Sequence, residues 1–240
     1  MSNGKMRVRP ATPADLKGIV EVEKESWGEG VGAGTMASPE ILLERIILCN
    51  NFHPGWFWVV EVRGGIVGYL VLMPTRMSPD ECKGWAMATD NGNLVGTFDP
   101  SGSFIYGASI AMVSKAPPGA MDLLVHAGHL LRLLSGKKVL YACARMPGFS
   151  RAHQKTGISA DEYWQLKQSD GTPKDPFLWH FATVIGLWPV KLLENGYPPD
   201  EESGGHGVLC VNTDPAKGLL TSASRLLSVN PASSKKGGGE

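Results

Sequence analysis

This chain of 240 residues lacks an excess charge of either sign, paired cysteine motifs and long apolar runs. Its 23 basic residues balance its 23 acidic residues, so no overall field draws it to nucleic acid or an anionic membrane. The four cysteines form no CxxC motif and stand at no zinc-ligand spacing from a histidine, which favours buried thiols in the cytoplasm. The chain has no apolar run near the ~20 residues that span a bilayer, and its first residues do not resemble a signal peptide.

The composition indicates a globular chain, because 42% apolar residues are enough to build a core. We expect one domain over residues 1–215. Residues 216–240 end in a stretch rich in serine, glycine and lysine, so we expect a linker or tail there.

The first third of the chain predicts a strand, two helices and a hairpin. Residues 6–10 alternate as in a strand, and the Thr-Pro-Ala-Asp that follows is typical of a helix start. That helix runs to about residue 27, and a glycine-rich loop separates it from a second helix over residues 38–48. Residues 56–62 and 66–73 flank an Arg-Gly-Gly turn and predict a β-hairpin.

The remaining chain predicts alternating strands and helices. Residues 74–102 are polar, and we expect a surface insertion. After it we expect strands at residues 104–113, 139–144, 187–193 and 207–211, and helices at residues 121–134 and within 149–185. The whole order, β-α-α-β-β-β-α-β-α-β-β, predicts an α/β protein with a mixed, mostly antiparallel sheet and helices on both faces.

This order resembles the GNAT (acetyltransferase) fold, as do the segments RPATPADLKGIVEVEKESW and SFIYGASIAMVSKAPPGAMDLLVHAGHLL. The resemblance implies that the fourth and fifth strands splay apart. It also implies that their unpaired backbone groups bind a pantetheine arm as an added strand. Ala111 and Val113 are the contacts that the resemblance implies for that arm.

One loop departs from the usual GNAT pattern. Ordinary members carry Arg/Gln-x-x-Gly-x-Gly/Ala here, and its amides hold the coenzyme A pyrophosphate at a helix N-terminus. In this chain the loop is KAPPGA, so Gly119 and Ala120 remain but two prolines remove N–H donors. We expect an acyl group carried on an acyl carrier protein, which has pantetheine without adenosine diphosphate. The alternative is a divergent loop that still binds coenzyme A.

The segments ARMPGF, ADEYW, DPFLWHF, LLENGYPPDEES and GHGVLCVN resemble GNAT-like decarboxylases of polyketide synthase loading modules, of the curacin and gephyronic acid type. The resemblance implies decarboxylation of a malonyl-type thioester, and a methylated malonyl unit in particular, to form a polyketide starter unit. The partners that it implies are an acyl carrier protein and other polyketide synthase domains. It implies no metal and no organic cofactor, with coenzyme A serving only as a surrogate carrier.

The same resemblance suggests site residues. It places His180 and Trp27 in the acyl tunnel, where His180 would donate to the thioester oxygen or orient the carboxylate. Both are alternatively ordinary core residues. The family also has a threonine near the fifth strand, which VLYACAR lacks, so Ser109 or Tyr106 is the candidate hydroxyl.

Three further residues are weaker candidates for the substrate pocket. The family arginine after the sixth strand is absent, which leaves Asn195 or Tyr197 at that place. Arg145 has the fork geometry to hold a carboxylate, although a salt bridge at the strand end is the alternative. His126 and His129 share a helix face, but no third ligand stands nearby, so we expect no metal.

Two other functions remain open at this point. One is a coenzyme A-dependent N-acyltransferase, for which Glu23, Glu25 or Glu61 would be the base and Tyr197 the acid. The other is a non-catalytic module that docks an acyl carrier protein. For carrier docking we expect a basic patch, with candidates Arg132, Lys137, Lys138 and Arg151.

Overall fold

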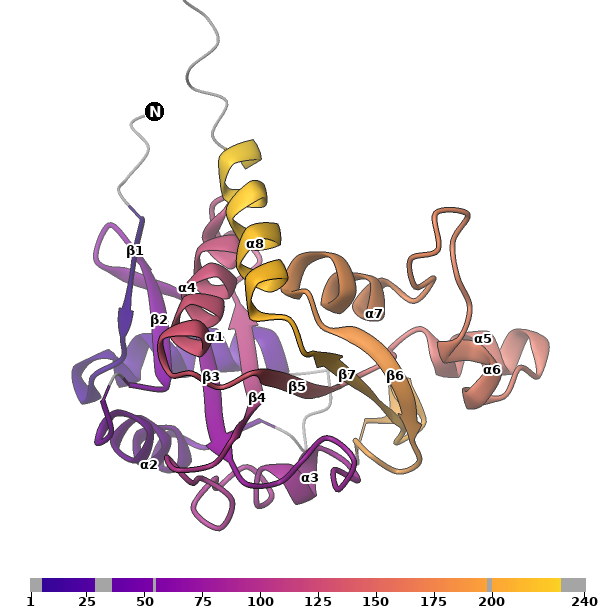
Figure 1. The fold of residues 1–240 in the computed structure, drawn as a ribbon, viewed down its shortest axis with the longest axis horizontal. Coiled ribbons are helices and arrows are strands. Elements are labelled where there is room, and N and C mark those ends of the chain that lie inside the picture. The colour runs from indigo at the N-terminus through magenta and orange to yellow at the C-terminus, as the bar shows by residue number, and fades with distance from the viewer. Residues whose placement is uncertain (1–5, 29–35, 54, 198–199, 230–240) are drawn as a thin grey trace, which may run out of the picture.

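The computed structural model describes residues 6–28, 36–53, 55–197 and 200–229 (Figure 1). Its strands form one sheet in the order β1-β2-β3-β4-β5-β7-β6, in which β4 and β5 are parallel and all other neighbours antiparallel. The strands are β1 (Met6–Pro10), β2 (Phe57–Val62), β3 (Gly65–Thr75), β4 (Phe104–Met112), β5 (Val139–Ala144), β6 (Trp188–Leu193) and β7 (Gly207–Asn212). The predicted mixed, mostly antiparallel sheet is confirmed.

Helices cover both faces of this sheet. They are α1 (Leu16–Trp27), α2 (Pro39–Asn50), α3 (Trp85–Ala88), α4 (Ala120–Leu134), α5 (Phe149–Thr156), α6 (Ala160–Trp164), α7 (Pro176–His180) and α8 (Pro215–Val229). Short turns η1 (Pro13–Asp15), η3 (Phe181–Ile185, π-helical) and η4 (Glu201–Ser203) complete the chain. Side chains alternate along β3: Tyr69 meets α1 through Glu23, whereas Leu70 and Leu72 lie beneath Gly128 of α4.

The helix starts follow capping rules that the sequence carries. Ser38 accepts a hydrogen bond from the amide of Ile41 and opens α2. Asp175 accepts from the amides of Phe177 and Leu178 and opens α7. Because Asp175 is buried, this cap also fixes the direction in which α7 leaves the preceding loop.

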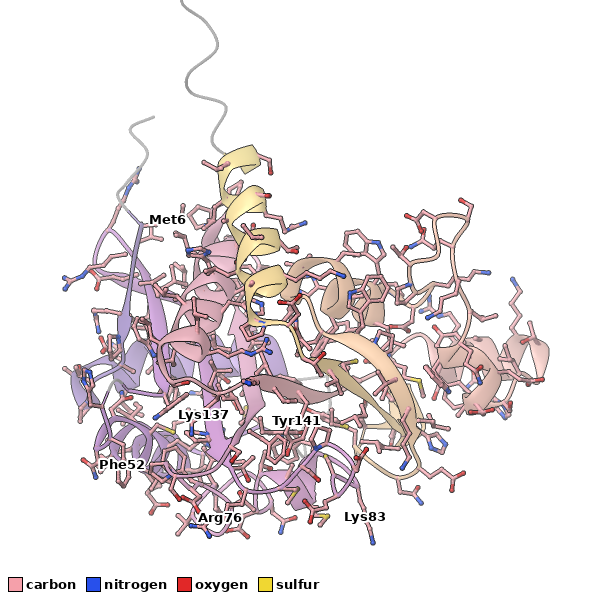
Figure 2. All side chains as sticks on the ribbon, viewed as in Figure 1. Met6, Phe52, Arg76, Lys83, Lys137 and Tyr141 are labelled. Atoms are coloured by element: carbon pink, nitrogen blue, oxygen red, sulfur yellow. The ribbon has the colours of Figure 1, made fainter. Side chains whose placement is uncertain are left out.

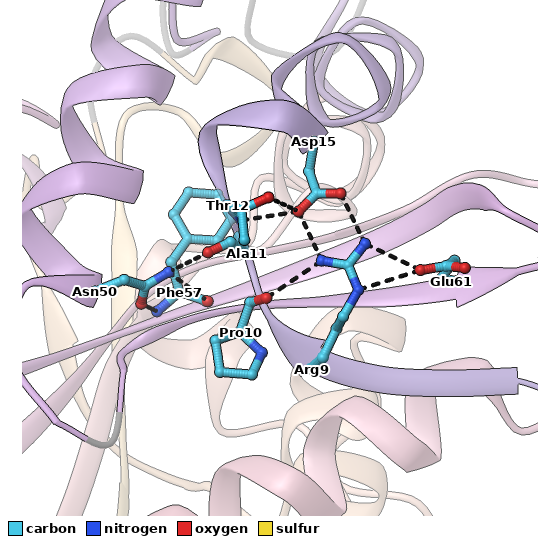
Figure 3. Close-up of polar contacts among 8 residues, drawn as sticks. All are labelled: Arg9, Pro10, Ala11, Thr12, Asp15, Asn50, Phe57 and Glu61. Atoms are coloured by element: carbon cyan, nitrogen blue, oxygen red, sulfur yellow. Dashed lines mark hydrogen bonds and ion pairs between the residues drawn. The ribbon is translucent and has the colours of Figure 1, made fainter.

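The guanidinium of Arg9 holds the start of the described chain against the sheet (Figure 3). Arg9 on β1 donates to Asp15 at 2.7 Å and to Glu61 on β2 at 2.9 Å. Nearby, the amide of Asn50 donates to the Ala11 carbonyl at 2.6 Å. These bonds hold η1 and α2 against the first two strands.

The surface insertion predicted for residues 74–102 is wrong in part. Cys82, Ala88 and Leu94 are buried in the core. From the β5 side, the Tyr141 hydroxyl donates to the Met77 carbonyl at 2.7 Å, and Lys137 donates to the Pro100 carbonyl at 3.1 Å (Figure 2). The segment packs into the core through a few apolar side chains within an otherwise polar run.

The linker predicted from residue 216 is also wrong over its first part. Residues Pro215–Val229 form α8, which lies beside α4 (Figure 1). Arg225 of α8 pairs with Asp122 of α4 at 2.6 Å, and Ser222 is buried. Residues 230–240 and the centre of the predicted glycine-rich loop, 29–35, lie outside the described residues. None of the described helices has the length and apolar character to cross a membrane.

Candidate functional site

A gap between two parallel strands shapes the candidate site. Among the described residues, β4 and β5 pair only where Phe104, Ile105 and Tyr106 meet Val139, Leu140 and Tyr141. Beyond this point the strands splay apart, as the sequence resemblance implied. A cavity of about 100 Å³ lies in the opening. Residues Gly107 to Ile110 of β4 line it.

The backbone register shows which groups face the opening. The Val113 amide donates to the Val67 carbonyl on the β3 side at 2.9 Å. Backbone groups alternate in direction along an antiparallel pair, so those of Ala111 also face β3, opposite its partner Tyr69. Ala111 and Val113, the pantetheine contacts that the resemblance implies, therefore direct their backbone groups toward β3. The backbone groups of Ile110, one residue before Ala111, face the opening.

Two neighbouring contacts agree with this register. The Ala108 carbonyl accepts from Trp85 Nε1 at 3.0 Å, and the Met112 carbonyl accepts from Ser26 Oγ at 3.3 Å. Both carbonyls point away from β3. Ile110, between them, presents its backbone to the cavity with no strand of the described chain beside it.

The loop before α4 has few free amides. Gly119 takes a left-handed φ of 86° as the N-cap of α4, and the Ala120 amide is bonded to the Pro117 carbonyl. The Ser114 amide donates to Glu25, and the Ala116 amide to the Val113 carbonyl. Carboxylates also lie beside the loop, because Asp122 is in the first turn of α4. This loop is a weak site for a pyrophosphate.

Apolar side chains form most of the cavity wall. Trp27 at the end of α1 lines it, as predicted from the sequence. Phe177, Phe181 and Ile185, four residues apart along α7 and η3, line it as well. The π-helical turn is notable because such turns are frequent at functional sites. These walls are suited to a short acyl chain.

Arg145 from the end of β5 closes one side of the cavity. Its Nε and Nη2 donate to the two oxygens of Asp200 at 2.7 and 2.6 Å, and Nη2 also donates to Glu202 at 3.0 Å. Its guanidinium lies 5.8 Å from the ring of Trp27 and 5.9 Å from that of Phe177. Because Asp200 occupies the fork of the guanidinium, Arg145 has no fork left for a substrate carboxylate, which agrees with the salt-bridge alternative.

Glu23 from α1 closes the other side. Its Oε1 accepts the Ala37 amide at 2.7 Å, and its Oε2 accepts the hydroxyl of Tyr69. The same hydroxyl lies 3.2 Å from Ser109 Oγ on β4. Ser109, which the sequence analysis offered as a hydroxyl, therefore lines the cavity at the end of a hydrogen-bonded chain.

The pKa values of the carboxyl groups of Glu23 and Asp200 are shifted in opposite directions. Burial raises the pKa of Glu23, and hydrogen bonds from Tyr69 and Ala37 offset this only in part. Burial also acts to raise the pKa of Asp200, but the hydrogen bonds from Arg145 and Ser203 outweigh it and hold that pKa below its usual range. Glu23 can therefore keep a proton under conditions in which Asp200 is ionised.

Three predicted site residues lie away from the cavity. His180 immediately precedes the lining residue Phe181 but does not itself line the cavity, and burial together with the charge of Arg225 lowers its pKa. Tyr106 on β4 is fully buried, and its hydroxyl accepts a hydrogen bond from the Cys143 amide at 3.3 Å. Asn195 is exposed in a turn with a φ of 51°. By contrast, Tyr197 is buried and lines the cavity.

The structure also places the predicted basic patch and the histidine pair. Arg132 is fully buried and donates to Asn212 at 2.9 Å, so it cannot contribute to a docking surface. His129 bonds the Ile185 carbonyl at 2.8 Å, and His126 bonds Ser222 at 3.1 Å. Across the described parts of the chain, no three histidine, cysteine or acidic side chains gather as a metal site.

Sequence reasoning missed several residues that line the cavity. Trp85 lies in the segment predicted to be a surface insertion; its amide bonds the Gly196 carbonyl at 2.7 Å, and its ring stacks 5.7 Å from Tyr197. Arg45 of α2 is buried and lines the cavity, and it forms no ion pair with a described carboxylate. A lone tryptophan inside a polar run was the one signal that pointed to Trp85.

Solved structures with this architecture include a GNAT-like decarboxylase and a loading GNATL domain. The GphF GNAT-like decarboxylase in complex with isobutyryl-CoA matches with a TM-score of 0.67 and 22% identity over 86% of this chain and 98% of that one. The loading GNATL domain of CurA from Lyngbya majuscula matches with a TM-score of 0.73 and 19% identity over 89% and 99%.

Acetyltransferases share the fold less closely. An N-acetyltransferase from Staphylococcus aureus Mu50 matches with a TM-score of 0.53 and 13% identity over 87% of this chain and 98% of that one. No protein-family model matches the chain, and no curated protein gives a significant match. The chain has the GNAT fold. Within that fold, it is similar in structure to the GphF GNAT-like decarboxylase and to the loading GNATL domain of CurA.

Proposed function

We propose that this domain removes carbon dioxide from malonyl-type thioesters, methylated ones in particular, to form a polyketide starter unit. The observation that carries the proposal is the free backbone edge of β4 at Ile110, directly beside an apolar cavity. An extended pantetheine arm would bond to this edge as an added strand, which places its acyl group in the cavity.

The walls of the cavity suit the chemistry. Loss of carbon dioxide leaves an enolate, which needs a hydrogen-bond donor at the thioester oxygen and surroundings that do not solvate the departing carboxylate. The Ile110 amide would be that donor. Arg45 would attract the malonyl carboxylate as it enters, since the charge of Arg145 is offset by Asp200. His180 has no direct part in this proposal.

The proposed carrier is an acyl carrier protein, with other polyketide synthase domains as further partners in the cytoplasm. The loop before α4 supports this choice, because Pro117 and Pro118 donate no N–H bonds and Glu25 occupies the Ser114 amide. Coenzyme A would act as a surrogate carrier. The likeness to GphF, which was solved with isobutyryl-CoA, supports an acyl thioester as the ligand, and the proposal needs no metal or organic cofactor.

Intact-protein mass spectrometry tests the proposal. Carrier proteins loaded with malonyl, methylmalonyl and dimethylmalonyl groups are incubated with the domain, and we expect the loss of one carbon dioxide. Phe181→Trp should fill the cavity and abolish this loss, whereas Trp179→Ala, on the exposed side of α7, should not affect it. Binding of the carrier without any loss of mass would point to a docking module and reject the proposal.

Acyl transfer from coenzyme A is the second candidate, because Glu23 lies buried at the cavity as a base for an amine would. Release of free thiol from acetyl-CoA in the presence of amines measures this activity. Turnover that saturates at low acetyl-CoA concentration would favour the transferase. We expect none, because the loop before α4 offers too few amides for the pyrophosphate.

A further inference from the structure

A hydrogen-bonded chain of three side chains begins and ends at the cavity. Glu23 is 3% exposed and lines the cavity, and its Oε2 shares a hydrogen bond with the Tyr69 hydroxyl. The ionised carboxylate accepts in this bond, whereas a protonated Glu23 would donate to the Tyr69 oxygen and leave the Tyr69 hydroxyl to donate to Ser109. Tyr69 is fully buried between them, and its oxygen lies 3.2 Å from Ser109 Oγ. Ser109 precedes Ile110, the residue whose backbone faces the opening. A proton can therefore pass from Glu23 to the place where the acyl group would lie.

Decarboxylation creates a need for one proton. When the bond between the α-carbon and the carboxylate breaks, its electron pair stays on the α-carbon and forms the enolate. One proton must then reach that carbon to give the saturated acyl thioester. Water would deliver it from either face of the enolate, whereas a fixed donor delivers it from one face.

The surroundings of Glu23 suit a neutral acid. Glu23 meets a phenol and a backbone amide, and no described cation lies within ion-pair distance. Arg45 and Tyr197 act on it from farther away. Burial raises its pKa above the ordinary value of 4.5, which favours the protonated form. A buried carboxyl without a charged partner at a cavity is an uncommon arrangement that points to function.

We propose that Glu23 supplies the proton that quenches the enolate, through Tyr69 and Ser109. This inference rests on the proposed decarboxylation. Ser109 gives its hydroxyl proton to the α-carbon, takes one from Tyr69, and Tyr69 takes one from Glu23. Water that enters the cavity returns a proton to Glu23. The three transfers move one proton in total, so the enolate and the proton account for the product.

Decarboxylation of methylmalonyl-loaded carrier protein in heavy water tests the relay. Intact mass reports the loss of carbon dioxide, and the configuration of the deuterated α-carbon reports which face was protonated. We expect the wild-type domain to give one configuration. Glu23→Gln and Tyr69→Phe should still lose carbon dioxide, within about tenfold of the wild-type rate, but should give both configurations in nearly equal amounts. The deuterium content of unreacted substrate corrects for exchange before reaction.

The variants separate a relay from a structural role. Glu23→Gln keeps an oxygen to accept the Ala37 amide but carries no acidic proton. Ser109→Ala leaves the pair of Glu23 and Tyr69 intact and decides the question if the other variants fail to fold. Tyr141→Phe, which removes a buried hydroxyl bonded to the Met77 carbonyl away from the cavity, should keep the wild-type configuration.

The outcomes distinguish the relay from the function on which it rests. A single configuration retained by Glu23→Gln, Tyr69→Phe and Ser109→Ala would overturn the relay while decarboxylation stands. A wild-type domain that loses no carbon dioxide from any malonyl unit would overturn the proposed function, and the relay with it. A mixture of configurations from the wild-type domain would likewise reject a fixed donor.

Discussion

Two buried carboxyl groups lie at or next to the cavity: Glu23 lines it, and Asp200 pairs with the lining residue Arg145. Their surroundings differ. Asp200 lies on the side built from β5 and the loop after β6, where two nitrogens of Arg145 reach it at 2.6 and 2.7 Å. Glu23 lies on the side built from α1, β3 and β4, where it meets a phenol and an amide. The first carboxyl group is held as a charge, whereas the second is suited to hold a proton.

The comparison shows that contact geometry, rather than the presence of a nearby arginine, decides the state of a buried acid. Arg45 also lines the cavity, but its Nε donates to the Gly92 carbonyl at 2.6 Å instead of to Glu23. A direct fork favours the ionised carboxylate by charge-assisted hydrogen bonds, and a distant cation does so much less. The Asp200 side therefore stabilises the fold, and the Glu23 side is available for chemistry.

Arg145→Ala should give the largest effect. It leaves Asp200 buried without its partner, which typically costs about 3–5 kcal/mol of unfolding free energy. Urea unfolding at neutral pH measures the loss. Arg76→Ala, which removes an exposed ion pair with Asp99, is the control and should leave stability nearly unchanged. Equal losses in the two variants would contradict a structural role for the Asp200 side.

A pair of proline substitutions on β4 tests the other side. Ala111→Pro removes an amide that faces β3 and should destabilise the fold by about 3 kcal/mol. Ile110→Pro removes an amide that faces the opening, so the sheet ladder stays intact. We expect it to fold but to bind an acyl-pantetheine about tenfold more weakly, because one hydrogen bond of ~1 kcal/mol is lost and the ring crowds the edge. Calorimetric titration and thermal unfolding measure both effects, and the reverse pattern would reject the register.

The pH dependence of stability should differ between the two carboxyl groups. The pKa of Glu23 is raised in the folded state, so its contribution is fully present below about pH 4.5 and is lost as the pH rises through the folded pKa. The pKa of Asp200 is lowered, so its contribution is present above about pH 3.8 and is lost as the pH falls through the folded pKa. Urea unfolding measured across pH tests this. Glu23→Gln should remove the loss of stability as the pH rises, and Asp200→Asn should remove the loss as the pH falls. Unchanged slopes would contradict the assignment.

His180→Ala should give the smallest effect on activity. His180 does not line the cavity, so the rate of carbon dioxide loss should stay within about twofold of wild type, as for substitutions outside a site. The carrier-protein mass assay measures this rate. A loss of activity as large as that of Phe181→Trp would show that His180 acts in the site. It would also contradict the set of α7 and η3 residues that line the cavity in the structure.

Local patterns predicted most of the fold correctly. Alternation identified the strands, and the capping residues Thr12, Ser38 and Asp175 marked helix starts that the structure confirms. α8 was missed because its serines and glycine resemble a linker. Its helix is stabilised by packing on α4, with Ser222 buried and Arg225 paired to Asp122.

The residues that line the cavity were harder to predict, because a side chain or backbone group faces the cavity only from certain positions around a helix or along a strand. His180 and Phe181 are adjacent in the chain, yet about 100° apart around a helix, so Phe181 lines the cavity and His180 does not. The spacing of Phe177, Phe181 and Ile185 carried the correct phase in the sequence. The choice between Ile110 and Ala111 depends in the same way on which partner pairs with β4, and that partner lies far away in the chain.

The sequence by itself determined the order of strands and helices, the positions of several caps and the proline-containing loop before α4, because short-range sterics and hydrogen bonding act within a few residues. Only the folded structure shows that Trp85, Arg45 and Glu23 meet at one cavity. It also gave Asp200, but not Glu23, a guanidinium partner. These outcomes depend on packing between segments far apart in the chain, which no local pattern encodes.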